Sequence, residues 1–210
     1  TGTGKTHLVQ CIAKAIHGSD KSLLTVNCGE FQMEHEVAKL IGAPPGYLGH
    51  RETLPFLTQA KLNSVISSAS SLSIVLFDEV EKAANSLGRL LLGVLDKATL
   101  RLGDNTTVNF EKSLIFMTSN LGAGEMSRLS RERFDMVARE ASPDRIKQSA
   151  MRALKKKYTP EFINRLDAAI VFKPLTQEDG RRIARVELGK MADHILLRRR
   201  DWLEKSNVSW

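Results

Sequence analysis

The chain has 210 residues, 42% of them hydrophobic and 26% charged, which is the ordinary balance of a globular domain with part of a second one. No apolar run approaches the length of a membrane span, so we expect no membrane partner. The net charge of +7 permits nucleic-acid binding, but no recognised binding motif accompanies it, which argues against that partner.

The first six residues, Thr1-Gly-Thr-Gly-Lys-Thr6, fit the end of the phosphate-binding pattern Gly-x-x-x-x-Gly-Lys-Ser/Thr, whose first glycine is expected before residue 1. Backbone N–H groups at Gly2, Thr3 and Gly4 would point at phosphate oxygens. Lys5 would reach the β- and γ-phosphates, and the Thr6 hydroxyl would bind Mg²⁺. The alternative is a flexible Gly/Thr-rich terminus before an ordinary helix.

Apolar residues at helical spacing follow this loop and predict a helix over residues 8–16, whose positive N-terminal end would favour an anion. Residues 23–27 are expected to form a strand. Residues 31–41 and 54–67 are predicted to be helices, and Gly42-Ala-Pro-Pro-Gly46 separates them.

A short apolar run, Ser73-Ile-Val-Leu-Phe-Asp-Glu79, ends in two acids. It predicts a buried parallel strand, and ligands in parallel sheets gather at the carboxyl ends of strands. We therefore expect Asp78 to hold Mg²⁺ and Glu79 to act as the general base toward the attacking water. The alternative is a core strand followed by a solvated helix cap. Together with the Gly-Lys-Thr sequence, the acids favour hydrolysis of a nucleoside triphosphate.

The remaining elements of this part are a helix over residues 86–99, a hairpin over 100–108, and strands over 113–118 and 168–172. Strands that alternate with helices predict an α/β fold, with a parallel sheet covered by helices on both faces. Pro174 would end the last strand, and Thr176 to Asp179 resembles a capping box. We expect a large nucleotide-binding subdomain over residues 1–174 and the incomplete start of a smaller one over 175–210.

The two cysteines, Cys11 and Cys28, lack the spacing of metal ligands. We expect both to be reduced, buried packing residues, and the protein to be cytoplasmic.

Five segments stand in the order and spacing of one known family. They are Thr1-Gly-Thr-Gly-Lys-Thr6, Gly42-Ala-Pro-Pro-Gly-Tyr-Leu-Gly49, Val75-Leu-Phe-Asp-Glu-Val-Glu-Lys-Ala83, Met117-Thr-Ser-Asn-Leu-Gly122 and Pro160-Glu-Phe-Ile-Asn-Arg-Leu-Asp167. With them, the whole chain resembles the Clp family of AAA+ unfoldases, nearest to the second ATPase domain of ClpB-type disaggregases. The resemblance implies the AAA+ P-loop fold with a small helical lid domain, and ATP with Mg²⁺ as ligands.

The resemblance also implies roles for single residues. Asn120 matches sensor 1, which faces the γ-phosphate, and Arg165 matches the arginine finger, which reaches the site of a neighbouring subunit in a ring of six. Tyr47 matches the aromatic residue that grips substrate in the central pore, and Ile183 would touch the adenine. The alternatives are a turn asparagine, a surface arginine paired with Asp167, and a tyrosine that packs against the Pro-Pro turn.

The function implied is ATP-dependent unfolding or disaggregation, in which unfolded or aggregated protein is threaded through the ring, with helper chaperones as further partners. Two features depart from the family pattern. The sequence after the loop that contains Tyr47 is His50-Arg-Glu-Thr53. Residues 121–149 contain neither the Ile-Gly-Leu-like nor the Leu-Gly-Phe-like tripeptide with which relatives dock on a protease. A stand-alone remodeller is therefore preferred over an unfoldase cap of a protease. A nucleotide-gated assembly scaffold without threading and a nucleic-acid motor remain open.

Overall fold

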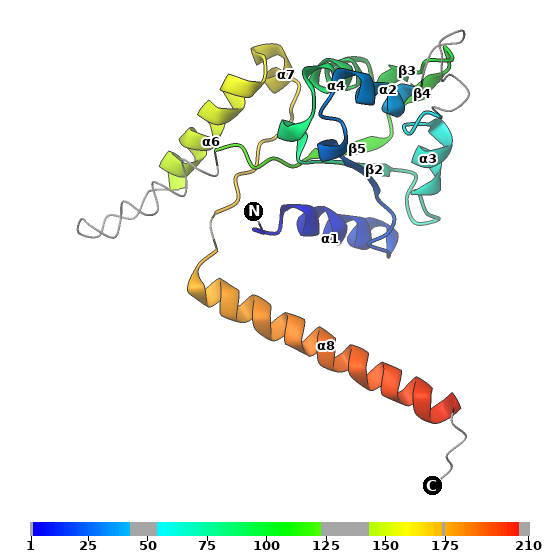
Figure 1. Ribbon diagram of the computed structural model, residues 1–210, viewed down its shortest axis with the longest axis vertical. Coiled ribbons are helices and arrows are strands. Elements are labelled where there is room, and N and C mark those ends of the chain that lie inside the picture. The colour runs from blue at the N-terminus through cyan, green and yellow to red at the C-terminus, as the bar shows by residue number, and fades with distance from the viewer. Residues whose placement is uncertain (1, 43–53, 123–142, 174, 206–210) are drawn as a thin grey trace, which may run out of the picture. The chain divides into compact units, whose positions relative to one another are not determined.

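The computed structural model describes residues 2–42, 54–122, 143–173 and 175–205, and the chain divides into two compact units, Thr1–Phe172 and Lys173–Trp210. The first unit is built on a sheet of three parallel strands in the order β1 (Leu24–Asn27), β2 (Ser73–Asp78) and β5 (Ser113–Met117), shown in Figure 1. The strands are parallel, so their carboxyl ends lie at one edge, where Asn27 is paired in register with Asp78.

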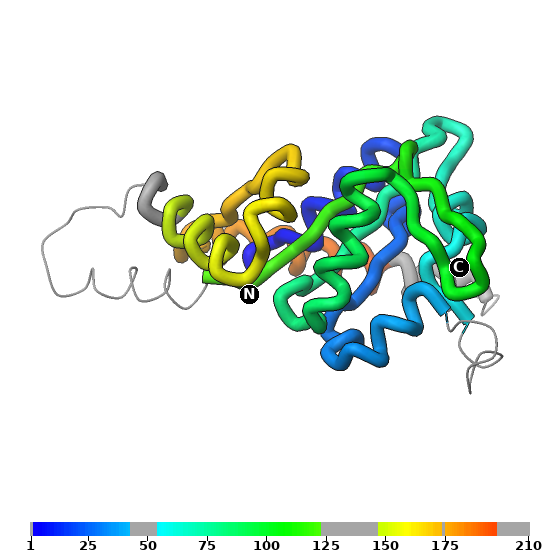
Figure 2. The backbone as a smooth tube through the Cα atoms, turned by 90° about the horizontal axis from the view of Figure 1, so that it is seen from above, coloured from blue at the N-terminus to red at the C-terminus, as the bar shows by residue number. Residues whose placement is uncertain are grey.

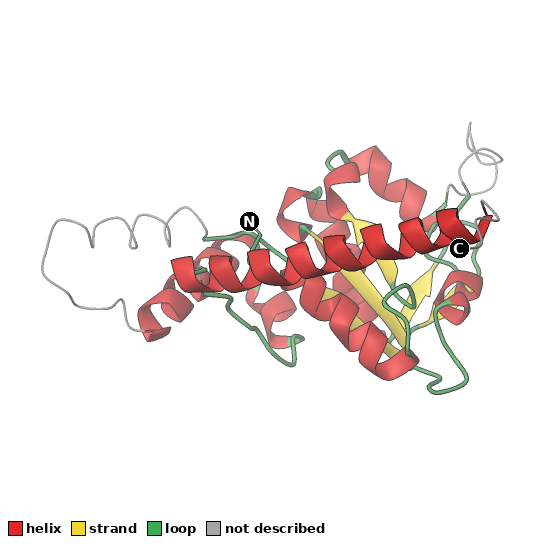
Figure 3. Cartoon of the chain, turned by 90° about the horizontal axis from the view of Figure 1, so that it is seen from below, coloured by secondary structure: helices red, strands yellow, loops and turns green. Residues whose placement is uncertain are grey.

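The central strand β2 explains why its sequence is apolar without interruption. Ile74, Val75, Leu76 and Phe77 are each at most 1% exposed. Alternate side chains of a strand point to opposite faces, so both faces of β2 must be covered. Figure 3 shows helices on either side of the sheet.

One face of the sheet packs against α1 (Lys5–His17), whose Val9 and Ala13 contact Ile74 and Leu76. The opposite face, with Val75 and Phe77, packs against α2, α3 and α4. These helices span Glu34–Ile41, Gln59–Ser64 and Asn85–Lys97. The predicted α/β architecture, with a parallel sheet covered on both faces, is confirmed.

The hairpin predicted after α4 is also present. It consists of β3 (Thr99–Arg101) and β4 (Thr107–Asn109), which pair antiparallel with Leu100 opposite Val108. Both of these side chains are buried in the larger core cluster. Figure 2 shows the hairpin at one end of the first unit and α6 (Pro143–Lys157) with α7 (Pro160–Asn164) at the other.

Two predicted helices are shorter in the structure than the sequence indicated. The helix predicted over residues 54–67 is reduced to α3, because Phe56 and Leu57 donate their N–H groups to carbonyls at the end of α2, and Thr58 caps the helix start. The predicted helix over residues 31–41 likewise begins only at Glu34, after the short helix η1 (Cys28–Glu30).

Residues 168–172 do not form the predicted strand. A strand needs a neighbour to pair its N–H and C=O groups, and the sheet of the described residues ends at β5. Ile170 is accordingly 72% exposed.

The second unit contains α8 (Gln177–Lys205), and its start has the predicted capping box. The Asp179 N–H donates to the Thr176 hydroxyl (3.1 Å), and the Asp179 carboxylate accepts the Thr176 N–H (2.9 Å). Within the part of the chain that the structure describes, no helix combines the length and apolar character needed to cross a bilayer.

Candidate functional site

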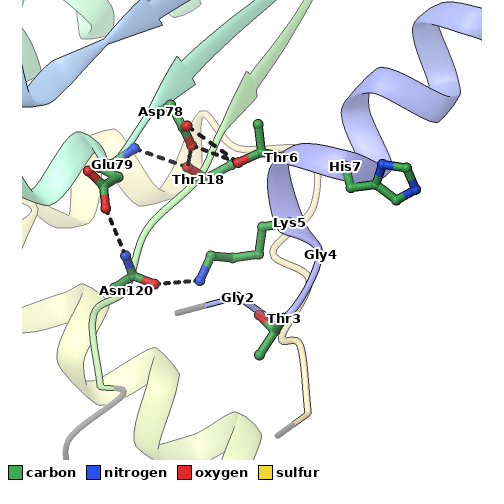
Figure 4. A pocket seen from close by; sticks show the side chains of 10 residues that line it. All are labelled: Gly2, Thr3, Gly4, Lys5, Thr6, His7, Asp78, Glu79, Thr118 and Asn120. Atoms are coloured by element: carbon green, nitrogen blue, oxygen red, sulfur yellow. Dashed lines mark hydrogen bonds between the residues drawn. The ribbon is translucent and has the colours of Figure 1, made fainter. Parts of the chain in front are cut away.

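An open pocket of about 350 Å³ lies at the carboxyl ends of β2 and β5, beside the start of α1 (Figure 4). Eight of the residues singled out in the sequence line it, and Thr118 and His7 complete the lining. The eight are Gly2, Thr3, Gly4, Lys5, Thr6, Asp78, Glu79 and Asn120. The structure thus brings together two segments that lie more than seventy residues apart in the sequence.

The loop side of the pocket depends on two glycines. Gly2 and Gly4 have φ angles of 77° and 87°, the left-handed region that L-residues rarely adopt, although a Cβ at either position would meet no atom within 4 Å. Backbone conformation, rather than space, therefore requires glycine here. Gly4 is the N-cap of α1, whose first turn has no side-chain cap and no acidic residue. The uncapped N–H groups and the helix dipole favour an anion at this end of the pocket.

The acidic side of the pocket offers oxygen ligands suited to a hard cation. The Thr6 hydroxyl donates to the Asp78 carboxylate, with distances of 3.1 Å to Oδ1 and 3.3 Å to Oδ2, and Thr118 Oγ1 donates to Asp78 Oδ1. Among the described residues, no group of three or more His, Cys, Asp or Glu side chains is arranged around a metal position. One carboxylate and one hydroxyl nevertheless fit Mg²⁺, which is commonly held by one or two carboxylates together with substrate phosphates.

Both carboxylate oxygens of Glu79 and its backbone N–H have partners. Asn120 Nδ2 donates to one carboxylate oxygen (3.3 Å), Lys82 Nζ is 2.6 Å from the other, and the Glu79 N–H donates to Thr118 Oγ1 (3.0 Å). Its φ of 57° is unusual for a residue with a side chain. Strained backbone of this kind persists only where surrounding contacts enforce it, which points to a functional position.

Asn120 joins the two sides of the pocket. Its Oδ1 accepts a hydrogen bond from Lys5 Nζ at 2.6 Å, while its Nδ2 reaches Glu79. A neutral amide between an ammonium and a carboxylate can hold both in place without changing the charge of the site. Figure 4 shows this chain of contacts from Lys5 through Asn120 to Glu79.

The two cysteines differ in their surroundings. Cys28 is fully buried, and its pKa is raised to about 12, first by burial and then by the carboxylates of Asp78, Glu81 and Glu79. Cys11 is exposed on α1, with its sulfur 3.6 Å from Nε2 of His7. The expectation of a buried residue holds for Cys28 and is wrong for Cys11, which lies on the solvent side of its helix.

Two predicted site residues, Arg165 and Ile183, do not line the pocket, and a third, Tyr47, lies outside the described residues. Arg165 follows α7 and does not line the pocket. Its Nη2 is 2.6 Å from Oδ1 of Asp96 at the end of α4, rather than paired with Asp167. Ile183 belongs to α8 in the second unit and is 46% exposed. Tyr47 is among residues 43–53, outside the described residues.

The sequence interpretation missed several residues of this site. Thr118 lies at the end of β5, Glu81 and Lys82 follow Glu79 in the short helix η2 (Val80–Lys82), and His7 follows the loop. Thr118, Glu81 and Lys82 could have been found from their positions in the sequence, because polar residues that directly follow β2 and β5 lie at the same edge of the sheet.

The fold and the pocket together define a P-loop nucleotide-binding protein. The model of the AAA domain (Cdc48 subfamily) matches residues 1–169, and the chain belongs to that family. Nucleotide binding follows from this membership.

Relatives agree with the resemblance to Clp proteins. The chain is 36% identical to the chaperone protein ClpB of Vibrio vulnificus (strain YJ016) over 195 residues, which are 93% of this chain and 21% of the relative. It is 34% identical to the protease ATP-binding subunit ClpC of Staphylococcus aureus (strain USA300), over 93% of this chain and 23% of the relative. The chain therefore spans about a fifth of the length of these relatives.

Solved structures agree as well. A Saccharomyces cerevisiae Hsp104–casein complex in an extended conformation matches 91% of this chain and 30% of its own, with a TM-score of 0.72 and 28% identity. An Hsp104–ADP complex from the same yeast has a TM-score of 0.69 and 27% identity, with the same coverage. The AAA+ fold and the Clp-family resemblance are thereby confirmed.

Proposed function

We propose that this chain is the ATP-hydrolysing domain of a protein remodeller. The observation that carries the proposal is the single pocket into which the loop residues Lys5 and Thr6 converge with Asp78, Glu79 and Asn120. These residue types, at the uncapped start of a helix, suit a triphosphate and its metal ion.

Each side chain has a task that its position supports. The backbone of residues 2–6 cradles the phosphates, and Lys5 offsets the negative charge of the β- and γ-phosphates. Thr6 and Asp78 would hold Mg²⁺, which would supply positive charge to offset that of the phosphate oxygens. Glu79 accepts a proton from the attacking water, and Asn120 orients that carboxylate and the γ-phosphate.

Arg165 acts on the site of a neighbouring copy. It does not line the pocket of its own chain, and its side chain is 47% exposed although it is paired with Asp96. A partly exposed arginine beside a helix end can reach another subunit and stabilise charge on the transferring phosphoryl group. This assignment requires a ring, which we propose to be a hexamer.

Threading of unfolded protein is the proposed work of this ring. An Hsp104 structure, which contains casein, is among the solved relatives, so an extended polypeptide is the substrate class we propose. Tyr47 would grip that chain, and Ile183 would contact the adenine. We propose the cytoplasm as the location and helper chaperones as further partners.

A second candidate function is the unfoldase cap of a protease. The ClpC relative favours it, because it is a protease ATP-binding subunit of nearly the same identity as the ClpB relative. The two functions share the pocket and differ in what receives the threaded chain.

The deciding experiment measures ATP turnover of the full-length protein with and without unfolded casein, at concentrations that allow rings to form. Stimulation by casein that remains intact supports the remodeller. Casein degradation after addition of a Clp-type peptidase supports the protease cap. Turnover that is insensitive to casein and accompanied by nucleotide-dependent assembly would instead support a scaffold.

A further inference from the structure

Glu81 is an acidic residue beside the pocket for which the reaction described above has no task. It is in η2, two residues after Glu79, but it does not line the pocket. Its Oε1 instead accepts the backbone N–H of Asn120 at 3.0 Å. This bond joins the segment after β2 to the segment after β5, next to the side chain that links Lys5 and Glu79.

The second carboxylate oxygen of Glu81 is an unusual feature. Oε2 is buried and has no hydrogen-bond partner among the described residues. A buried carboxylate oxygen without a donor is costly, so its retention calls for a reason.

A matching donor is also buried and unpaired. The hydroxyl of Tyr158, just beyond α6, has no partner within the described part of the chain. The pKa of this phenol is raised, first by burial and next by the negative charge of Glu81, so that charge acts on the hydroxyl. A phenol donates one hydrogen bond and a carboxylate accepts several, which makes them complementary.

Tyr158 is fixed on its other sides. Its ring stacks on Phe162 of α7, with centroids 4.7 Å apart, and it packs beside Gly88 of α4. Arg165 follows α7 directly. A contact between Tyr158 and Glu81 therefore joins the helix that precedes Arg165 to the backbone of Asn120.

We propose that Glu81 is a positioning residue for Asn120, and that the Tyr158 hydroxyl holds the other oxygen of the same carboxylate through one bridging water. Asn120 is thereby kept between Lys5 and Glu79, and its position is tied to α7. This inference rests on the proposed function, because it gives Asn120 a task at the triphosphate.

The test is a double-mutant cycle in the full-length protein. Glu81→Ala is expected to lower kcat for ATP about tenfold while KM changes less than about twofold, because the bond orients a group rather than binding the nucleotide. Glu81→Gln keeps an oxygen for the Asn120 N–H and retains most of kcat. In an Asn120→Ala background, Glu81→Ala has no further effect, since it acts through Asn120. Independent, multiplying losses would overturn the proposal.

Tyr158→Phe tests the second contact, because it removes the hydroxyl and keeps the ring that stacks on Phe162. We expect kcat to fall about threefold, and to fall no further when Tyr158→Phe is added to Glu81→Ala. Glu111→Ala, an exposed glutamate after β4, is the matched control and leaves kcat unchanged. A full additional loss in the double variant would remove Tyr158 from the proposal.

Amide hydrogen exchange gives a readout that needs no turnover. The Asn120 amide should exchange at least about tenfold faster in Glu81→Ala, with β2 unaffected. Unchanged exchange would show that Glu81 does not hold Asn120, whatever the kinetics. A parent protein that does not hydrolyse ATP would remove the proposed function, while the exchange result would still decide whether this contact exists.

Discussion

Thr118 shows how one hydroxyl organises the acidic side of the pocket. Its Oγ1 accepts the Glu79 N–H and donates to Asp78, while its carbonyl accepts the Val80 N–H. At 6% exposure, it has little access to water as a replacement partner. The positions of both acids therefore depend on a residue that lies forty positions further along the chain.

Replacement of Thr118 by valine keeps the shape of the side chain and removes the hydroxyl. The Glu79 N–H then loses its partner, so we expect the free energy of unfolding to fall by about 1–3 kcal/mol. Asp78 loses a donor as well, so turnover should need a higher Mg²⁺ concentration. Denaturation and a magnesium titration of ATPase activity measure the two effects. Thr118→Ser, which keeps the hydroxyl, should behave like the parent in both.

Glu79→Gln tests the general base. The amide keeps the size of the side chain and cannot accept a proton, so kcat should fall about a hundredfold or more while ATP stays bound. Binding of a fluorescent ATP analogue and single-turnover hydrolysis separate the two properties. Normal hydrolysis by this variant would assign the base to another residue.

The elements show what could be predicted from the sequence and what could not. β2 was predictable because burial on both faces requires an uninterrupted apolar run, and α4 because its apolar residues recur at helical spacing. The start of the helix predicted over 54–67 was not, because the N–H groups of Phe56 and Leu57 bond to carbonyls at the end of α2, a contact between distant residues. The strand predicted over 168–172 was wrong because a strand forms only where another strand pairs its backbone N–H and C=O groups, and residues 168–172 have no such neighbour among the described residues. In the site, the phosphate loop and the acids of β2 are local motifs, whereas Thr118 and Glu81 act through contacts between segments.

The packing of α4 on the sheet can be tested with Leu87→Ala. Leu87 is 1% exposed and belongs to the core cluster that includes Val75 and Phe77. The cavity left behind should lower the free energy of unfolding by about 2–5 kcal/mol. Leu8→Ala is the matched control, because Leu8 is 40% exposed and the same truncation there should cost less than about 1 kcal/mol. Equal losses in urea denaturation would contradict the observed burial.

At the scale of the whole molecule, the pocket brings together the loop of residues 2–6, the proposed metal ligands Thr6 and Asp78 and the proposed general base Glu79, but no arginine lines it within the described residues. Arg165 is held at the surface by Asp96, at the junction of α7 and the end of α4. This ion pair is about half exposed, so little stability depends on it and the arginine is free to exchange partners. The arrangement favours a catalytic site that is completed by a second copy.

Mixing two inactive variants tests this sharing directly. Arg165→Ala retains Glu79, and Glu79→Gln retains Arg165, so a mixed ring contains sites in which an intact Glu79 faces an intact arginine from the next subunit. We expect Arg165→Ala alone to lose about a thousandfold in turnover and Glu79→Gln alone to lose about a hundredfold. The mixture should recover a measurable part of the parent activity. Arg89→Ala, which removes an exposed arginine paired with Glu34, should retain activity alone. An arginine that acted within its own chain would give no recovery on mixing, because every site would then lack one of the two groups.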